Sequence, residues 1–266
     1  MKIMANRMDR GFFRYQEEFE SKALEVLRSG WYVLGNEVKS FEEEFAAYTG
    51  GNHCVGLASG LDALWIAFRL LGIGKGDEVI VQGNTYIASV MGITMNGATP
   101  IFVEPNPYYN IDVSKIEEKI TERTKAILVV HLYGQASNMA EVKKLTEKYN
   151  LKLVEDCAQS HGACFDGQMT GTFGDVGCFS FYPSKNIGAF GDGGGLLLPA
   201  QPAGAEAAAE GQPRLLVDNA EEDGDVFRCA RLRRSAYRTQ QCLSGGRHLC
   251  RLRHARLVLR CRGRGG

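Results

Sequence analysis

The chain has 266 residues, of which 44% are hydrophobic and 23% charged, and its formal net charge is zero. This composition is typical of a soluble globular protein with one large domain and a smaller piece. A balanced charge gives no argument for a nucleic-acid or membrane partner, no apolar run is long enough to span a bilayer, and the N-terminus lacks a signal-peptide pattern. We therefore expect a cytoplasmic protein.

The first part of the chain, residues 1–34, is predicted to be an N-terminal helical arm. It contains an amphipathic helix at about 14–28; a turn at 29–35 and a further helix at 37–48 come after it. Beyond the arm, strand-like and helical patterns alternate, which favours an α/β fold with a mostly parallel sheet and helices on both faces. The expected strands are 53–59, 78–82, 100–104, 126–132, 152–157 and 178–182, and the expected helices are 61–71, 85–96, 112–121 and 138–149.

In such a sheet, ligands bind at the carboxyl ends of the strands. The helix at 138–149 has the clearest boundaries, because Asn138 is an N-cap residue with Glu141 three positions later, and the pattern ends at Asn150.

The composition changes near residue 199. Residues 1–198 hold twelve lysines and six arginines, whereas the remainder holds thirteen arginines and no lysine. A basic nucleic-acid arm would have no reason to exclude lysine. The other interpretations are a disordered tail and translation in a shifted reading frame. We hypothesise a frame shift close to Gly194, and divide the chain into an arm (1–34), an incomplete large domain (35–198) and an atypical tail (199–266).

The eight cysteines give no support for a metal site or a disulfide framework. No C-x-x-C pair is present, so structural zinc is not expected. Cys54, Cys157, Cys164 and Cys178 lie in or near apolar strand-like runs, where free buried thiols are common.

The segment 56–64, GLASGLDAL, has the pattern of a strand that turns sharply into a helix. Gly60 permits the turn, and the backbone N–H groups of Gly60 and Leu61 at the helix start favour a phosphate. A plain strand-to-helix turn is the alternative. The segment is not a P-loop, and the G-x-G-x-G at 72–76 precedes a strand, which argues against a nicotinamide-binding fingerprint.

Polar and aromatic side chains follow two further strands. Tyr86, in NTYIAS at 84–89, can stack on a planar ring, although a core tyrosine is an equal alternative. Asp156 closes an apolar strand, where a carboxylate needs a partner such as a cationic ring nitrogen. Gln159 can hydrogen-bond a phenolic oxygen. His161 is interpreted as a satisfied structural histidine rather than a base.

The last motif, FSFYPSKNIGAFGDGGG at 179–195, combines Ser180, a hydroxyl suited to a phosphate, with Lys185. A lysine in a partly dry pocket becomes nucleophilic. A lone lysine is usually a solvated surface charge, but the apolar and small neighbours of Lys185 favour the pocket.

These blocks, together with SGWYVLGNEVKSFEEEFAAYTG and EDCAQSHGA, occur in an order that resembles the DegT/DnrJ/EryC1/StrS family of sugar aminotransferases, from about residue 10 to residue 195. The resemblance implies an aspartate-aminotransferase-like large domain of fold type I that binds pyridoxal 5'-phosphate (PLP). It implies that Lys185 forms the Schiff base and Asp156 pairs with the pyridine nitrogen. It further implies that Gln159 meets the ring hydroxyl, Ser180 holds phosphate and Tyr86 stacks on the ring.

The resemblance also implies the reaction, which is transfer of an amino group from glutamate to a nucleotide-linked keto-deoxyhexose in a homodimer. The stretch 131–139, HLYGQASNM, is similar to members that aminate a 3-keto-6-deoxyhexose on dTDP. Relatives that dehydrate carry histidine in place of the lysine, and Lys185 argues against that branch. The family's small C-terminal domain is not recognisable after residue 199. The alternative is therefore an inactive PLP-binding or regulatory protein on the same fold.

Overall fold

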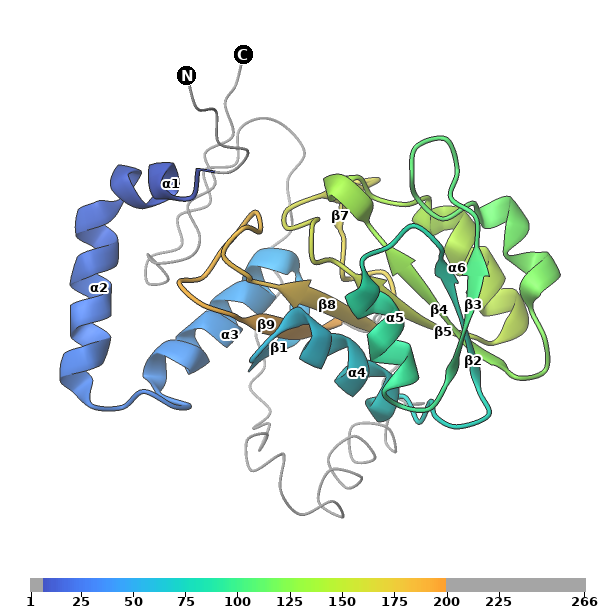
Figure 1. Cartoon of the computed structure of the whole chain (residues 1–266), viewed down its shortest axis with the longest axis horizontal. Helices are drawn as coiled ribbons and strands as arrows, with labels where there is room; N and C mark the ends of the chain where they lie inside the picture. Colours follow the sequence, from blue (N-terminus) through green and yellow to red (C-terminus); the bar gives the residue numbers. More distant parts are fainter. Residues whose placement is uncertain (1–6, 200–266) are drawn as a thin grey trace. The chain divides into compact units, whose positions relative to one another are not determined.

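The computed structural model describes residues 7–199, which form a seven-stranded sheet with helices on both faces (Figure 1). The strand order is β1-β9-β8-β5-β4-β2-β3, and a separate two-stranded hairpin pairs β6 with β7. The α-helices are α1 (Asp9–Arg14), α2 (Gln16–Ser29), α3 (Asn36–Thr49), α4 (Gly60–Leu70), α5 (Ile87–Thr94) and α6 (Met139–Tyr149). The strands are β1 (Gly51–Leu57), β2 (Glu78–Gln82), β3 (Thr99–Val103), β4 (Thr124–Val130), β5 (Lys152–Asp156), β6 (Cys164–Phe165), β7 (Gln168–Met169), β8 (Val176–Ser180) and β9 (Gly194–Pro199).

The central strands are buried on both faces, as expected when helices cover a parallel sheet. Every residue of β2 and β8 is buried, and the parallel pairs β2–β3, β2–β4, β4–β5 and β5–β8 place their carboxyl ends at one edge. One part of the core lies under α6, where apolar residues of four strands meet Met139 and Val142. The predicted mostly parallel α/β sheet is confirmed.

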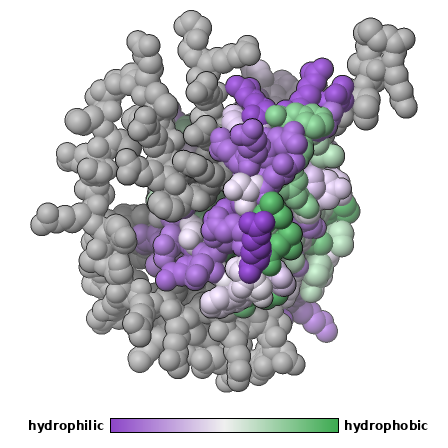
Figure 2. All heavy atoms as spheres, turned by 90° about the vertical axis from the view of Figure 1, so that its left-hand side faces the viewer, coloured by the Kyte–Doolittle hydropathy of each residue, from purple (hydrophilic) through white to green (hydrophobic). Residues whose placement is uncertain are grey.

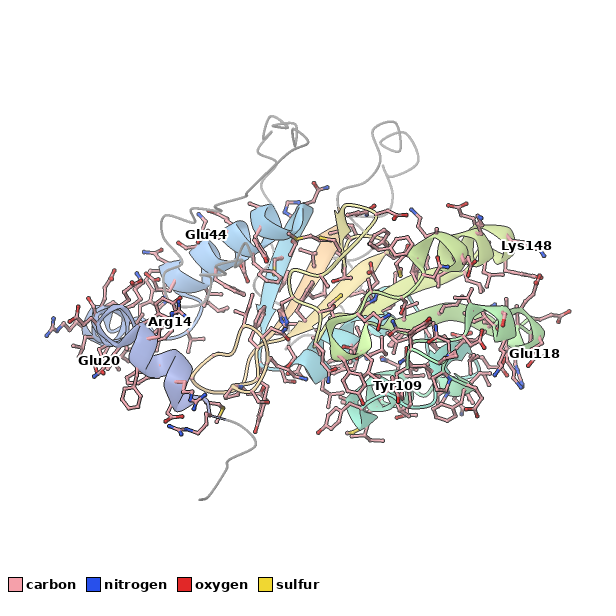
Figure 3. The ribbon with its side chains drawn as sticks, turned by 90° about the horizontal axis from the view of Figure 1, so that it is seen from above. Arg14, Glu20, Glu44, Tyr109, Glu118 and Lys148 are labelled. Carbon is pink, nitrogen blue, oxygen red and sulfur yellow. The ribbon has the colours of Figure 1, made fainter. Side chains whose placement is uncertain are left out.

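Alternate residues of a strand point to opposite faces of the sheet, so the neighbours Glu155 and Asp156 of β5 lie on opposite sides. Figure 3 shows α3 and α6 on one side of the sheet and α4 and α5 on the other. Asp156 of β5 is hydrogen-bonded to Ser89 of α5, so it faces the α4–α5 side. Glu155 therefore faces the α3–α6 side.

The strand β9 was not among the expected strands. It lies between β1 and β8 and runs antiparallel to both. Its four leading residues are glycine, glycine and two leucines, a pattern too short and too glycine-rich to show strand periodicity. All four are buried. The tail predicted at 199–266 lies outside the described residues apart from Pro199, and the hypothesis of a frame shift close to Gly194 stays a prediction.

The helix expected at 112–121 is wrong. This segment forms two 3₁₀ turns, Val113–Lys115 and Glu117–Lys119, closed by i→i+3 bonds such as Lys115 N–H to the Asp112 carbonyl. Asp112 also accepts a hydrogen bond from the Ser114 N–H through its side chain. The connection between β3 and β4 thus keeps Ile116 buried with single turns instead of a continuous helix.

The other boundaries agree with the expected ones to within a few residues. Asn138 caps α6 by accepting from the Glu141 N–H, and Asn150 ends the helix in a left-handed conformation. The helix expected at 14–28 is α2, and the short helix α1 before it was not expected; the backbone of Tyr15 leaves the helical region between the two. No helix among residues 7–199 is long and apolar enough to cross a membrane.

The helix α2 buries none of its residues in the described chain. Figure 2 views this end of the molecule, where hydrophobic and strongly hydrophilic side chains lie next to each other. Phe12 and Phe19 contact Phe190 edge-to-face, with ring centroids 6.0 and 5.0 Å apart. The N-terminal helices therefore touch the loop that carries Lys185.

Candidate active site

The start of α4 forms a narrow cradle against the end of β8. Ser59 caps the helix by accepting from the Asp62 N–H, which fixes the turn after β1. A side-chain carbon at Gly60 would lie 2.6 Å from Ser180 Cβ, so only glycine permits this approach. The helix supplies no acceptor for its own first N–H groups. Those of Gly60 and Leu61, beside the Ser180 hydroxyl, make a site suited to phosphate.

Asp156 lies at the carboxyl edge of β5 and is 5% exposed. Its carboxylate accepts hydrogen bonds from Ser89 Oγ at 2.7 Å and from the Ala158 N–H at 3.1 Å. Burial raises the pKa of Asp156, while these bonds and the charge of Lys185 act to lower it. Since both hydrogen-bond donors are neutral, the carboxylate can still pair with a cationic group.

Lys185 is half-buried in a tight loop between β8 and β9. Its N–H donates to the Tyr182 carbonyl at 2.8 Å, and the loop is closed by Phe181 N–H to the Gly193 carbonyl at 2.7 Å. The side chain lines a pocket of about 360 Å³ together with Tyr133, Gln159, Ser184 and Asn186. The structure thus brings Lys185 and Gln159 together, and Asp156 is near enough for the positive charge of Lys185 to lower its pKa.

The Gln159 amide has a defined orientation. Its Oε1 accepts from the Tyr133 N–H at 2.7 Å, so its NH₂ group is the part left to donate elsewhere. Tyr133, Ser89, Ser184 and Asn186 were not predicted as site residues. Only Ser89 had a usable signal, because it lies in the NTYIAS segment one turn after Tyr86.

Tyr86 is not a core tyrosine, since it is 71% exposed just before α5. That interpretation is therefore wrong. The exposed ring remains available for stacking, although it does not line the Lys185 pocket.

His161 packs against Phe179 and Phe181, with centroids 5.5 Å from each. Burial lowers its pKa to about 4, so the ring is neutral near pH 7. This packing supports a structural role for His161, but the prediction that its ring nitrogens are fully hydrogen-bonded is not supported. Both ring nitrogens are buried, and neither makes a well-formed hydrogen bond within residues 7–199, although the Ser180 backbone and Asn186 side chain lie close.

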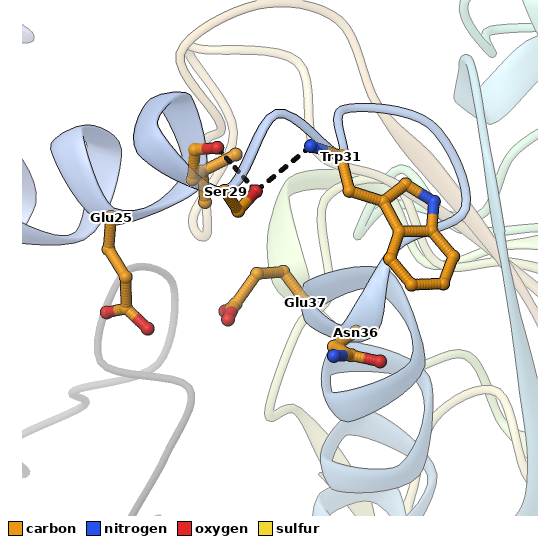
Figure 4. A pocket seen from close by; sticks show the side chains of 6 residues that line it. Glu25, Ser29, Trp31, Asn36 and Glu37 are labelled. Carbon is orange, nitrogen blue, oxygen red and sulfur yellow. Dashed lines mark hydrogen bonds between the residues drawn. The ribbon is translucent and has the colours of Figure 1, made fainter.

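A further pocket, of about 190 Å³, lies between α2 and the start of α3 (Figure 4), and none of the predicted site residues lines it. Ser29 Oγ donates to the Val26 carbonyl and accepts from the Trp31 N–H there. The two acidic residues of this pocket, Glu25 and Glu37, are both paired with Lys22. The pocket is therefore explained as the space at the junction of α2 and α3, and its acidic groups are already paired.

Comparison with known proteins agrees with this geometry. The family model described as the DegT/DnrJ/EryC1/StrS aminotransferase family matches residues 14–210, which extends past the last glycine of the quoted motifs. The chain belongs to this family. The predicted resemblance is confirmed, although the match ends at residue 210 and not near residue 195, and the fold type I large domain is confirmed as well.

Two relatives and one solved structure show how much of the family is covered. A "dTDP-3-amino-3,6-dideoxy-alpha-D-galactopyranose transaminase" of Aneurinibacillus thermoaerophilus is 58% identical over 169 residues, 63% of this chain and 47% of that protein. A "dTDP-3-amino-3,4,6-trideoxy-alpha-D-glucose transaminase" of Streptomyces venezuelae is 49% identical, covering 68% and 48%. The crystal structure of S. venezuelae DesV in complex with a ketimine intermediate has a TM-score of 0.71 at 45% identity, covering 73% and 53%. The chain therefore spans about half the length of these relatives.

Proposed function

We propose that the chain carries the cofactor-binding region of a PLP-dependent aminotransferase that moves an amino group from glutamate to a nucleotide-linked keto-deoxyhexose. The observation that carries the proposal is the convergence of a buried carboxylate, Asp156, and Lys185 at one strand edge. The names of the relatives support the sugar-nucleotide class.

The residues present fit PLP. The glycine-dependent cradle at Gly60 and Ser180 suits its phosphate, and Asp156 offers a buried anion with neutral donors to a cationic ring nitrogen. The free NH₂ of Gln159 suits an anionic phenolic oxygen. When bound, PLP supplies the electron sink for removal of the proton beside the amino group.

We assign roles to the chain's own residues from the ordered motifs, and the positions described above support several of them. Gly60, Leu61 and Ser180 bind the phosphate, and Asp156 holds positive charge on the ring nitrogen. Tyr86 covers the ring. Lys185 would hold the cofactor through a covalent bond to its Nζ, and the free amine of Lys185 would take up and return the proton, a role that typically contributes about 10²–10⁴-fold to the rate.

We infer further that two copies of the chain associate. Large apolar side chains are exposed along α5 and the neighbouring edge strand β3, namely Ile87, Met91, Met95 and Phe102. Exposed contiguous apolar residues of this kind mark association surfaces. Light scattering of the purified chain is expected to give twice the monomer mass, and a monomer at micromolar concentration contradicts this part. The cytoplasmic location stays a prediction.

The test is a titration of the purified chain with PLP, followed by visible absorbance and borohydride trapping. We expect a visible band in the wild type, and mass spectrometry is expected to place the reduced adduct on Lys185. Lys185→Ala should lose both, whereas Lys125→Ala, at an exposed position on β4, should keep them. An adduct that persists in Lys185→Ala would overturn the assignment of that lysine.

The reaction needs its own measurement. Incubation of the loaded chain with glutamate should shift the band as the cofactor takes up the amino group, and a dTDP-linked keto-sugar should restore it. Loading without either shift would contradict the aminotransferase and would favour a binding protein on the same fold.

A further inference from the structure

A second buried carboxylate lies directly beside Asp156 but faces the other side of the sheet. Glu155 is 0% exposed. Its oxygens accept from three backbone N–H groups, those of Gly171 at 2.8 Å, Phe173 at 2.7 Å and Gly174 at 2.9 Å. The fourth partner is His131 Nε2, at 2.9 Å. A buried carboxylate with this many partners is fully satisfied and rigid.

The His131 ring, also 0% exposed, has its proton position fixed by these contacts. Its Nδ1 accepts from the Ser137 N–H at 3.1 Å, so the proton is on Nε2 and is donated to Glu155. His131, Glu155 and Cys157 lie close enough together to suggest a metal site. Both ring nitrogens are already used, however, which leaves no lone pair for a metal.

The bond from Ser137 to His131 closes a loop that begins at the end of β4. Within that loop Tyr133 has φ 58° and Gly134 φ 83°. A left-handed conformation is unfavourable for tyrosine, so surrounding contacts must hold it. Asn110 supplies some of them, donating to the carbonyls of Gln135 and Ala136.

The conformation of the loop has one direct consequence for the site. It points the Tyr133 N–H at Gln159 Oε1, 2.7 Å away. An amide whose oxygen is taken can present only its NH₂ group to the pocket. An amide without this bond can rotate and present its oxygen, which would repel an anionic oxygen on a ligand.

We propose that His131, oriented by Glu155, is a positioning residue that sets the polarity of the Gln159 amide through the 131–137 loop. This inference rests on the proposed function, because it assigns the Gln159 NH₂ group to the phenolic oxygen of the cofactor. No contact between His131 and the cofactor is involved. The effect passes through Ser137, Tyr133 and Gln159.

Two substitutions separate the two bonds of His131. In His131→Asn, the side-chain oxygen can replace Nδ1 as acceptor for the Ser137 N–H. In His131→Gln, the NH₂ group can replace Nε2 as donor to Glu155, which keeps that carboxylate satisfied, but Ser137 loses its acceptor. The proposal expects His131→Gln to disturb Gln159 and His131→Asn to leave it close to wild type.

The first readout needs no cofactor. Amide hydrogen exchange of the free chain should show Tyr133 protected in the wild type and in His131→Asn, and at least 10-fold less protected in His131→Gln. Unprotected Tyr133 in the wild type, or equal protection in all three proteins, overturns the proposal. Because this arm uses the free chain, its result stands even if PLP fails to bind and the proposed function is rejected.

The second readout uses PLP and a double-mutant cycle. Without the Gln159 donor, the phenolic oxygen carries more negative charge and attracts the proton on the Lys185 nitrogen more strongly, so that this nitrogen loses its proton at a higher pH. The pH midpoint of the visible band should therefore rise in His131→Gln and in Gln159→Ala. If His131 acts through Gln159, adding His131→Gln to Gln159→Ala should cause no further rise. Two independent, additive rises would show a merely structural role and would refute the proposal.

Discussion

Replacement of Gly60 by alanine tests the phosphate cradle most directly. The added carbon would lie 2.6 Å from Ser180 Cβ, 3.2 Å from Ser180 Cα and 3.3 Å from its Oγ. Carbon atoms normally approach no closer than about 3.5 Å, so the start of α4 and the end of β8 must separate by roughly 1 Å. The obstacle is backbone and Cβ, which cannot rotate away.

The expected cost has two parts. Overpacking of a close contact typically costs about 1–3 kcal/mol, offset by up to about 1 kcal/mol because alanine favours helix over glycine. A hydrogen bond to a charged group contributes about 1.5–3 kcal/mol, so a cradle opened enough to lose one such bond should weaken PLP binding by about 10-fold or more. Urea unfolding and PLP titration measure the two parts separately.

A matched control is available on the neighbouring helix α5. A side-chain carbon at Gly92 of α5 would lie 2.6 Å from Leu64 Cβ of α4, so Gly92→Ala creates the same overlap away from the cradle. It should lower stability with little effect on affinity, and Gly191→Ala, with open space around it, should change neither. If Gly60→Ala binds PLP as the wild type does, or if Gly92→Ala weakens binding equally, the reasoning about the cradle fails.

Two further predictions concern buried ionisable groups. In Asp156→Asn, the side chain can keep the Ala158 contact and donate to Ser89. Because a buried charge is removed, the free chain should be at least as stable in urea, while PLP affinity should fall by about 10–100-fold. Unchanged affinity would exclude pairing with the ring nitrogen. Burial lowers the pKa of His161 from 6.5 to about 4, so between these pH values the unfolded chain binds more protons than the folded chain. The wild type should therefore lose up to ~3 kcal/mol of folding stability as the pH falls from 6.5 to 4. His161→Phe should lose this part of the pH dependence in urea unfolding at pH 7.5 and 4.5, and an unchanged dependence would contradict the shift.

The sequence was sufficient for those parts of the fold that depend on local patterns. Asn138 could be recognised as a cap because its side chain acts within its own helix turn. The position of Lys185 could be predicted because it follows a strand and is surrounded by small residues. Assignment of roles to Asp156, Gln159 and Ser180 came from the ordered motifs rather than from spacing, and those roles stay predictions.

What the sequence could not show are contacts that depend on distant segments. The bond between Ser89 and Asp156 joins residues on a helix and a strand far apart in the chain. Likewise, nothing local distinguishes Glu155 from a surface acid, and its burial is compensated by the loop at 171–174 and by His131. The expected helix at 112–121 is two short turns, with local bonds from Asp112 that its helical pattern did not reveal.

The position of β9 has a consequence for the order in which the protein acquires its structure. Within residues 7–199, β1 pairs with no strand other than β9, which in turn joins it to β8. The helix start at Gly60 is thus attached to the sheet by a segment synthesised some 130 residues later than itself. Because a loop this long must close before its contacts can form, we expect the phosphate cradle, which brings Gly60 against Ser180, to form late in folding. During synthesis the parallel strands β2 to β5 can therefore associate before the residues of the phosphate cradle come together.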